Sequence, residues 1–130
     1  MIKIGDQFKT EFVVTEELYE NFIKTSADNN ILHTNSAYAK QMGFPDKFMH
    51  GNILCSKLSY IIGKCLPTED VMIVNQSINF RAPFFLHDTI TLDLIAKETI
   101  DFLPGIEFTF VFKRAAAEVI ANGKIMIKLL

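Results

Sequence analysis

The chain lacks a long uninterrupted apolar segment and a block of basic residues. Its most apolar region, residues 53–66, contains Lys57 and Lys64, and is too short and too charged to cross a bilayer. A net charge of −2 without a basic cluster argues against binding to nucleic acid or to an anionic membrane. The N-terminus lacks the apolar run of a secretory signal, so we expect a cytoplasmic protein.

The motifs of several enzyme classes are also absent. There is no HExxH or HxxxH pattern, no glycine-rich phosphate loop and no GxSxG turn. The three histidines have no cysteine or acidic residue at a metal-ligand spacing, so we expect no metal site and no cofactor. Cys55 and Cys65 would lie roughly 15 Å apart on a straight helix, too far for a disulfide. We expect both to be small buried residues in a reducing compartment.

Length and composition allow a single globular domain over residues 1–130. The chain is 49% hydrophobic and 22% charged, a composition that can form a core. Its 130 residues are too few for two typical domains. Helix signals are concentrated in the first half and strand signals in the second. The elements expected first are a strand over 6–14, a helix from Thr15 to about Asp28, and a short helix from Asn35 or Ser36 through Met42.

A third, strongly apolar helix is predicted between His50-Gly51-Asn52 and Pro67. Its large hydrophobic residues leave little polar face, so we expect neighbouring elements to cover it nearly all round. These residues are Ile53, Leu54, Leu58, Ile61, Ile62 and Leu66.

The second half alternates between apolar and polar residues with the period of a β-strand. Alternation is clear over 89–94, 108–112 and 125–129. The expected turns are Leu86-His87-Asp88 and Leu103-Pro104-Gly105, and Asn122-Gly123 is expected to interrupt the last strand. The pattern predicts an α+β fold, in which four or five antiparallel strands curve around the apolar helix. Such a sheet leaves an edge strand open, so we expect a homodimer.

One short segment, Asp28 to His33, brings together a carboxylate, a carboxamide and an imidazole. A loop between two helices can bring Asp28 and His33 close, and a carboxylate beside a histidine can set its orientation for acid/base chemistry. Asn30 could hold the backbone or a substrate amide. The alternative is structural: Asp and Asn end a helix, and His33 is an ordinary surface residue.

A second cluster lies at His50-Gly51, where the apolar helix is expected to start. Glycine permits close approach of a ligand, and the free N–H groups of a helix start suit an oxygen that becomes negative during a reaction. The alternative is that Gly51 is only a turn residue and His50 a packed neighbour. His87, in a turn before a strand, is expected to be exposed and inert.

Four segments in order resemble the MaoC-like family of (R)-specific enoyl-CoA hydratases, which have the hotdog fold. The segments are Ser26–His33 with the following Ala37-Tyr38-Ala39, Phe48–Leu54, Asn79–Pro83, and Asp88-Thr89. They match the family's Asp-x-Asn-Pro-Leu-His block, its His-Gly-Met-Leu helix start, its Phe-(Arg/Lys)-x-Pro segment and its Gly-Asp-Thr turn. The resemblance covers nearly the whole chain.

The resemblance implies roles for particular residues. Asp28 and His33 would activate the water that adds to a trans-2-enoyl thioester, carried by coenzyme A or an acyl carrier protein, giving an (R)-3-hydroxyacyl thioester. The Gly51 N–H would polarise the thioester carbonyl. Asn30, His50 and Ser59 would complete the substrate site.

Three positions depart from the family's pattern: Ile31 replaces a proline, Asn52 an apolar residue, and His87 a glycine. Two other functions compatible with the fold are an acyl-CoA thioesterase and a non-catalytic acyl-binding module.

Overall fold

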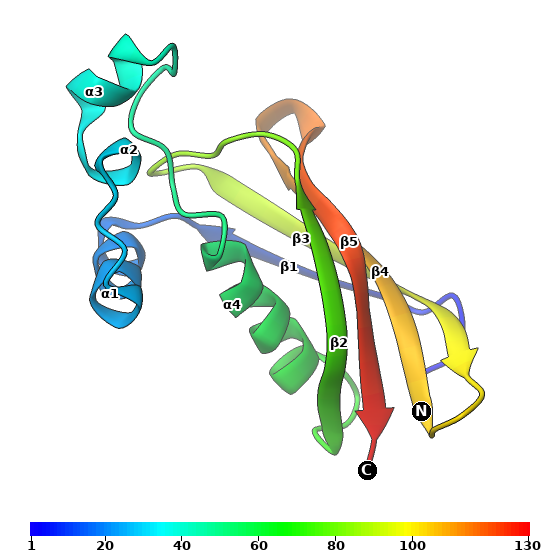
Figure 1. Ribbon diagram of the computed structural model, residues 1–130. Helices are drawn as coiled ribbons and strands as arrows, with labels where there is room; N and C mark the ends of the chain where they lie inside the picture. Colours follow the sequence, from blue (N-terminus) through cyan, green and yellow to red (C-terminus); the bar gives the residue numbers. More distant parts are fainter.

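The structure is a computed structural model that describes residues 1–130. Five strands form one antiparallel sheet, in agreement with the four or five antiparallel strands predicted, and their order is β1-β3-β4-β5-β2. Their bounds are Gln7–Val13 for β1, Val71–Phe80 for β2, Thr89–Ile100 for β3, Gly105–Arg114 for β4 and Glu118–Leu129 for β5. The sheet is curved, and helix α4 (Ile53–Tyr60) lies against its concave face (Figure 1). The expected α+β architecture is therefore present.

The core lies between α4 and the sheet. Phe108, Phe110 and Phe112 alternate along β4, so all three side chains point to one face, where they are almost fully buried. Ile53, Leu54 and Leu58 of α4 are also buried and belong to the same contiguous cluster of 22 residues. Each such side chain stabilises the fold by about 1.5–3 kcal/mol. The position of α4 on the sheet is thus fixed by a dense apolar contact.

Three further helices lie near the N-terminal end of α4, at the end of the sheet away from the C-terminus (Figure 1). Helix α1 (Glu16–Ser26) starts at Thr15, whose hydroxyl accepts from the Leu18 N–H at 3.1 Å, as its N-cap pattern predicted. Helix α3 (Ser36–Gln41) is the expected short helix. Helix α2 (Ile31–Thr34) was not predicted, because the polar residues before it suggested a loop.

The apolar helix differs from the prediction in two ways. It does not run unchanged to Pro67, because a π-helical turn, η1 (Ile61–Cys65), follows α4. It is also not covered all round: Ser56, Ser59 and Tyr60 are exposed, since the sheet packs against one side only. Cys55 and Cys65 are free, as expected, but half-buried rather than buried. None of the helices is long and apolar enough to cross a membrane.

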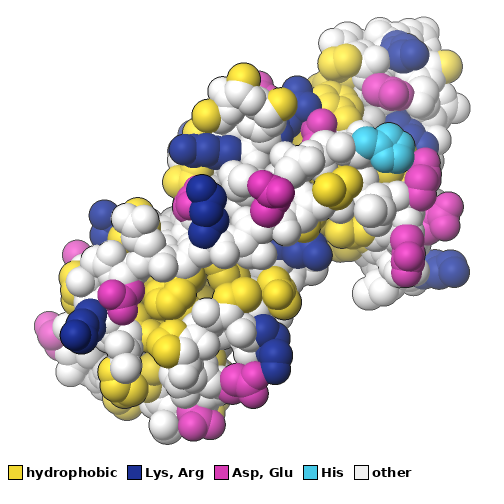
Figure 2. Space-filling view, turned by 180° about the vertical axis from the view of Figure 1, so that it is seen from behind, with side chains coloured by type: hydrophobic (Ala, Val, Ile, Leu, Met, Phe, Trp, Pro, Cys, Tyr) yellow, Lys and Arg dark blue, Asp and Glu magenta, His cyan; other side chains and the backbone are white.

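Charged side chains of both signs are interspersed on the face opposite to that of Figure 1, without a continuous basic stripe (Figure 2). This distribution agrees with the small net charge. It offers no extended positive surface to nucleic acid on this face.

The expected interruption of the last strand at Asn122-Gly123 is wrong, because β5 runs through both residues. The chain instead turns at Ala115–Ala117 (η2), where Ala116 and Ala117 have φ values of 58° and 61°. Gly123 is needed for close packing: a Cβ there would lie 1.9 Å from the Ser77 carbonyl oxygen and 2.8 Å from the Phe110 ring. The glycine therefore lets β5 lie against both the β2 backbone and the core.

We predict that Gly123→Ala destabilises the protein by about 1–3 kcal/mol or more, the usual cost of overpacking a core, because the Ser77 backbone cannot move aside cheaply. Urea unfolding followed by circular dichroism measures the change. Gly63→Ala is the matched control, since a Cβ at Gly63 meets no atom within 4 Å. Equal stability of the two variants would show that the Gly123 contact is unimportant.

Candidate active site

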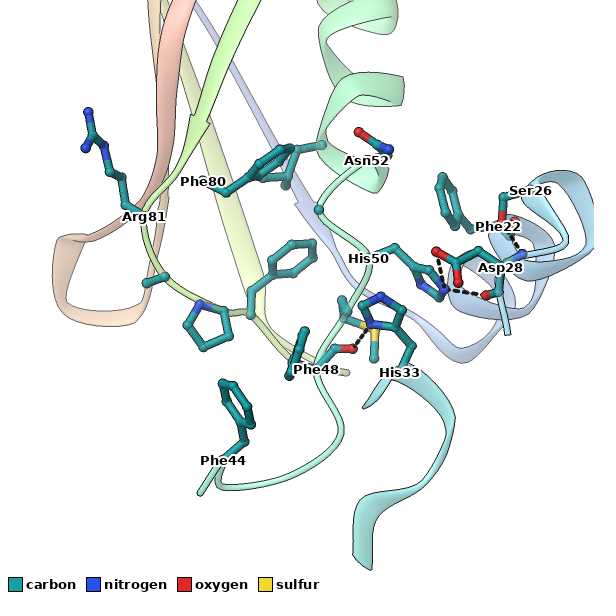
Figure 3. A pocket seen from close by; sticks show the side chains of 16 residues that line it. Phe22, Ser26, Asp28, His33, Phe44, Phe48, His50, Asn52, Phe80 and Arg81 are labelled. Atoms are coloured by element: carbon teal, nitrogen blue, oxygen red, sulfur yellow. Dashed lines mark hydrogen bonds and ion pairs between the residues drawn. The ribbon is translucent and has the colours of Figure 1, made fainter. Parts of the chain in front are cut away.

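The largest cavity, of about 670 Å³, lies at the N-terminal end of α4. The end of α1, the segment before α4, and the loop between β2 and β3 form its walls (Figure 3). Half of the 16 lining residues are hydrophobic, and five of these are phenylalanines: Phe22, Phe44, Phe48, Phe80 and Phe84. Polar side chains also line it, among them Asp28, His33 and His50. A cavity that combines apolar walls with convergent polar groups is typical of small-molecule sites.

Local hydrogen bonds shape the loop that carries Asp28. Helix α1 ends at Ala27, which adopts a left-handed conformation, with φ 59°. The Asp28 N–H then donates to the Ser26 hydroxyl at 3.1 Å, and Asp28 Oδ1 accepts from the Asn30 N–H at 3.1 Å. Asn30 Oδ1 accepts from the Leu32 N–H at 2.9 Å and so caps α2. These contacts make the loop compact and present Asp28 at the cavity.

His33 lies on α2 and is half-buried at the cavity wall. Its Nδ1 lies 2.7 Å from the Phe48 carbonyl oxygen, and a carbonyl can only accept, so Nδ1 carries the proton. In the neutral ring Nε2 is then unprotonated and can accept a proton. The backbone of this residue is also anchored, because the Tyr19 hydroxyl donates to the His33 carbonyl at 2.7 Å.

His50, immediately before the helix-start turn, is 2% exposed and connects the two clusters. Its Nε2 donates to the Asp28 carbonyl at 2.7 Å and lies 4.0 Å from the Asp28 carboxylate (Figure 3). Its ring centroid is 4.0 Å from that of His33, and its Nδ1 has no hydrogen-bond partner. Burial is the main cause that lowers the pKa of His50 below the ordinary 6.5; the charge of a protonated His33 acts in the same direction, and the bond to Asp28 opposes it.

The fold brings together Asp28, His33 and His50, whose ligand-type atoms lie within 4.8 Å of one another. Sequence spacing placed Asp28 and His33 together but did not show that His50 joins them. The pairing differs from the expectation in one respect: the Phe48 carbonyl, not Asp28, orients His33. A separation of this size between Asp28 and His33 suits a water molecule held by both side chains, within the reach of acid/base chemistry.

The same three residues raise the possibility of a metal ion, which the sequence spacing argued against. The ring centroids of His33 and His50 lie 4.0 Å apart, with 31° between the ring planes. One nitrogen of each ring already contacts a backbone carbonyl, His33 Nδ1 that of Phe48 and His50 Nε2 that of Asp28. Only His33 Nε2 and His50 Nδ1 therefore remain as imidazole ligands for an ion.

Gly51 follows His50 in the turn that opens α4. The N–H groups of Gly51 and Asn52 donate to no backbone or side-chain acceptor, as expected at a helix start. The Phe80 ring covers Gly51 so closely that a Cβ on Gly51 would lie 2.7 Å from Phe80 Cε1. The turn thus offers free donors at the cavity beside Asp28, His33 and His50, and a side chain on Gly51 would have to displace the Phe80 ring.

Two predicted substrate-binding residues do not line this cavity. Asn30 is exposed and its side-chain oxygen caps α2, while Ser59 lies on the uncovered side of α4. His87 is exposed, as expected. The phenylalanines of the cavity wall were not identified as site residues, although several of them flank the motifs that were.

The model of the "MaoC like domain" family matches residues 2–110 of the chain. The chain belongs to the MaoC-like family. This confirms the resemblance found in the sequence motifs. The chain is 32% identical to an (R)-specific enoyl-CoA hydratase of Rhodospirillum rubrum over 90 residues, which are 69% of this chain and 62% of that protein.

A second relative is a mitochondrial 3-hydroxyacyl-[acyl-carrier-protein] dehydratase of Arabidopsis thaliana, 30% identical over 69% of this chain and 53% of that protein. The chain therefore spans about half to three-fifths of these relatives. Among solved structures, the (R)-hydratase from A. caviae involved in PHA biosynthesis superposes with a TM-score of 0.91 at 23% identity, over 99% of this chain and 98% of that one. The predicted hotdog fold is confirmed.

The structure explains the part of the family's pattern that surrounds Asp88. Asp88 Oδ2 accepts from Arg114 Nη1 and from the Phe85 N–H, both at 2.8 Å, and so ties the β2–β3 loop to the end of β4. His87, where the family's pattern has glycine, has a φ of 71°, a conformation that favours glycine. The chain thus keeps the glycine-like backbone of this turn with a bulkier residue.

We predict that the free energy of unfolding falls as the pH drops below 6.5, because the unfolded chain then binds a proton at His50 more readily than the folded one. Above pH 6.5 His50 is neutral in both the folded and the unfolded chain, so it causes no such loss of stability. His50→Gln keeps a donor for the Asp28 carbonyl and should flatten the pH dependence. Urea titrations between about pH 5 and pH 8 measure both proteins. An identical slope in the variant would contradict the assignment.

Proposed function

We propose that the protein hydrates trans-2-enoyl thioesters to (R)-3-hydroxyacyl thioesters, or catalyses the reverse dehydration. The observation that carries the proposal is the position of Asp28 and His33 beside the free N–H of Gly51 in one cavity. The names of the relatives support the reaction, since one is an (R)-specific enoyl-CoA hydratase and another a 3-hydroxyacyl dehydratase. We extend their stereochemistry and their thioester substrates to this chain.

The geometry suggests the order of events. Water held between Asp28 and His33 loses a proton to His33 Nε2 as its oxygen bonds to C3 of the enoyl group. The electron pair of the C2=C3 bond moves toward the thioester oxygen, where the Gly51 N–H stabilises the negative charge. A proton returned from the Asp28/His33 pair to C2 completes the addition. The proposal needs no metal and no cofactor.

Spectroscopy of crotonyl-CoA and longer trans-2-enoyl-CoAs tests the reaction. Loss of the enoyl absorbance without release of free thiol is the expected result. Thiol release would indicate a thioesterase, and tight binding without either change would indicate an acyl-binding module. Either outcome would refute the proposed activity.

We expect Asp28→Asn and His33→Gln each to lower kcat by roughly 10²–10⁴, the usual contribution of general acid–base catalysis. The double variant should be little worse, because residues that act as a unit do not lose activity additively. Thermal unfolding of the variants should change little. His87→Asn is the control, since it alters an exposed histidine outside the cavity. Near-normal turnover by either single variant would refute the pair.

A side chain at Gly51 should keep the carbonyl oxygen of the substrate thioester away from the Gly51 N–H, and it should also push against the Phe80 ring. We predict that Gly51→Val lowers kcat on the order of a hundredfold or more, comparable to the loss of one oxyanion donor. Adding Phe80→Ala should recover stability by removing the clash, but should not recover turnover; Phe80→Ala alone is the control. Full activity of Gly51→Val would exclude Gly51 as the oxyanion donor.

We also propose that the protein is a cytoplasmic homodimer. Two features support pairing of copies: β2 is an open edge of the sheet, and the nearby side of α4 is uncovered, with Tyr60 50% exposed. Met72 and Val74 on β2 are 49% and 41% exposed, so this region offers apolar area to a partner. The two unpaired cysteines are compatible with a reducing compartment.

Light scattering at micromolar concentration should give about twice the mass of 14.8 kDa. Introducing a charge on the open edge, as in Val74→Lys, should shift the protein toward monomer. Glu11→Lys on β1, at the other edge of the sheet, is the matched control and should remain dimeric. A monomeric wild type with full activity would refute the dimer.

A further inference from the structure

One cationic side chain at the cavity has no role so far. The chain has two arginines, Arg81 and Arg114. Arg114 is paired with Asp88 and Glu118 and is half-buried. Arg81 is exposed, forms no ion pair, and is the one lysine or arginine that lines the cavity. A cation at a ligand cavity without a carboxylate partner is available to an anionic group of the ligand.

The base of Arg81 is held firmly. Its N–H donates to the Ile120 carbonyl at 2.8 Å, and the next N–H, that of Ala82, donates to the same oxygen at 3.2 Å. The Arg81 Nε donates to Asn122 Oδ1 at 3.3 Å, which leaves both terminal nitrogens of the guanidinium without a protein acceptor. The side chain is thereby oriented while its strongest anion-binding edge stays free.

Arg81 lies at the rim of the cavity and not beside the reacting groups. Its neighbour Phe80 faces inward against Gly51, and successive residues of an extended strand alternate in direction. Arg81 lies across the cavity from Asp28, and its guanidinium points away from His33 and His50 (Figure 3). A thioester whose carbonyl lies at Gly51 would place its acyl chain on one side and its long carrier arm on the other, leading out of the cavity.

We infer that Arg81 binds the phosphate at the end of the pantetheine arm of the substrate. This inference rests on the proposed function, because it assumes a thioester in the cavity. The pantetheine arm ends in a phosphate both in coenzyme A and on an acyl carrier protein, and the guanidinium binds phosphate oxygens in bidentate geometry. The protein carries a net charge of −2 and Asp28 faces the same cavity, so a cation at the mouth offsets repulsion of the anionic substrate.

The test compares three thioesters with the same enoyl group: those of coenzyme A, of an acyl carrier protein and of pantetheine, which lacks the phosphate. Arg81→Ala should raise KM about tenfold for the first two, the size expected for loss of one charge-assisted hydrogen bond, with kcat little changed. KM for the pantetheine thioester should not change. Arg81→Lys should recover part of the affinity, and the KM of the wild type for enoyl-CoA should rise with salt more steeply than that of Arg81→Ala.

Lys97→Ala is the matched control, because it removes an exposed cation on β3 that does not line the cavity. An equal rise in KM for all three thioesters, or no rise for any, would overturn the inference. A rise for the coenzyme A thioester alone would place the contact on its nucleotide, and a rise for the carrier-protein thioester alone would place it on the protein; both exclude the shared phosphate.

These outcomes are separate from the proposed function. If the wild type turns over none of the three thioesters, the hydratase proposal itself is wrong. If it turns over all three and Arg81→Ala behaves like the wild type, only the phosphate contact is wrong.

Discussion

The contact between α4 and the phenylalanine stripe of β4 is the constraint on which the remaining structure depends. Phe108, Phe110 and Phe112 can leave water only under a helix that presents an equally apolar side, and Ile53, Leu54 and Leu58 supply it. Once α4 is fixed there, its first turn must lie at one end of the sheet. The helices α1 to α3 can then reach this turn, so the site is assembled at a position set by the core.

His50 extends this constraint into the chemistry. It precedes the Gly51 turn in the sequence, and its imidazole donates to the Asp28 carbonyl 22 residues earlier. The turn with the proposed oxyanion donor and the loop with the proposed acid/base residues are therefore joined by a direct hydrogen bond. Preorganisation of this kind lets dipoles act without rearranging during the reaction. It also explains why a residue as polar as histidine is almost fully buried.

Much of this could be predicted from the sequence where local chemistry decides the outcome. The period-two alternation predicted the sheet, and the Thr15 cap predicted the start of α1. Asp28, His33 and Gly51, which the sequence proposed as site residues because their motifs are contiguous, line one cavity. The errors came from tertiary effects: Asn122-Gly123 looks like a turn, yet the glycine is there because β2 and Phe110 leave no space for a Cβ. The approach of His50 to Asp28, and the place of Ser59 outside the cavity, depend on how α4 packs, which no local pattern encodes.

Both cavity histidines are held by carbonyl groups of the main chain, His33 by that of Phe48 and His50 by that of Asp28. Every residue type has such a carbonyl, so a side-chain replacement at position 48 would leave the acceptor of His33 in place. The Phe48 side chain, by contrast, belongs to the cavity wall. Evolution can therefore reshape the wall at this position for a different ligand while the tautomer of the neighbouring histidine is inherited unchanged.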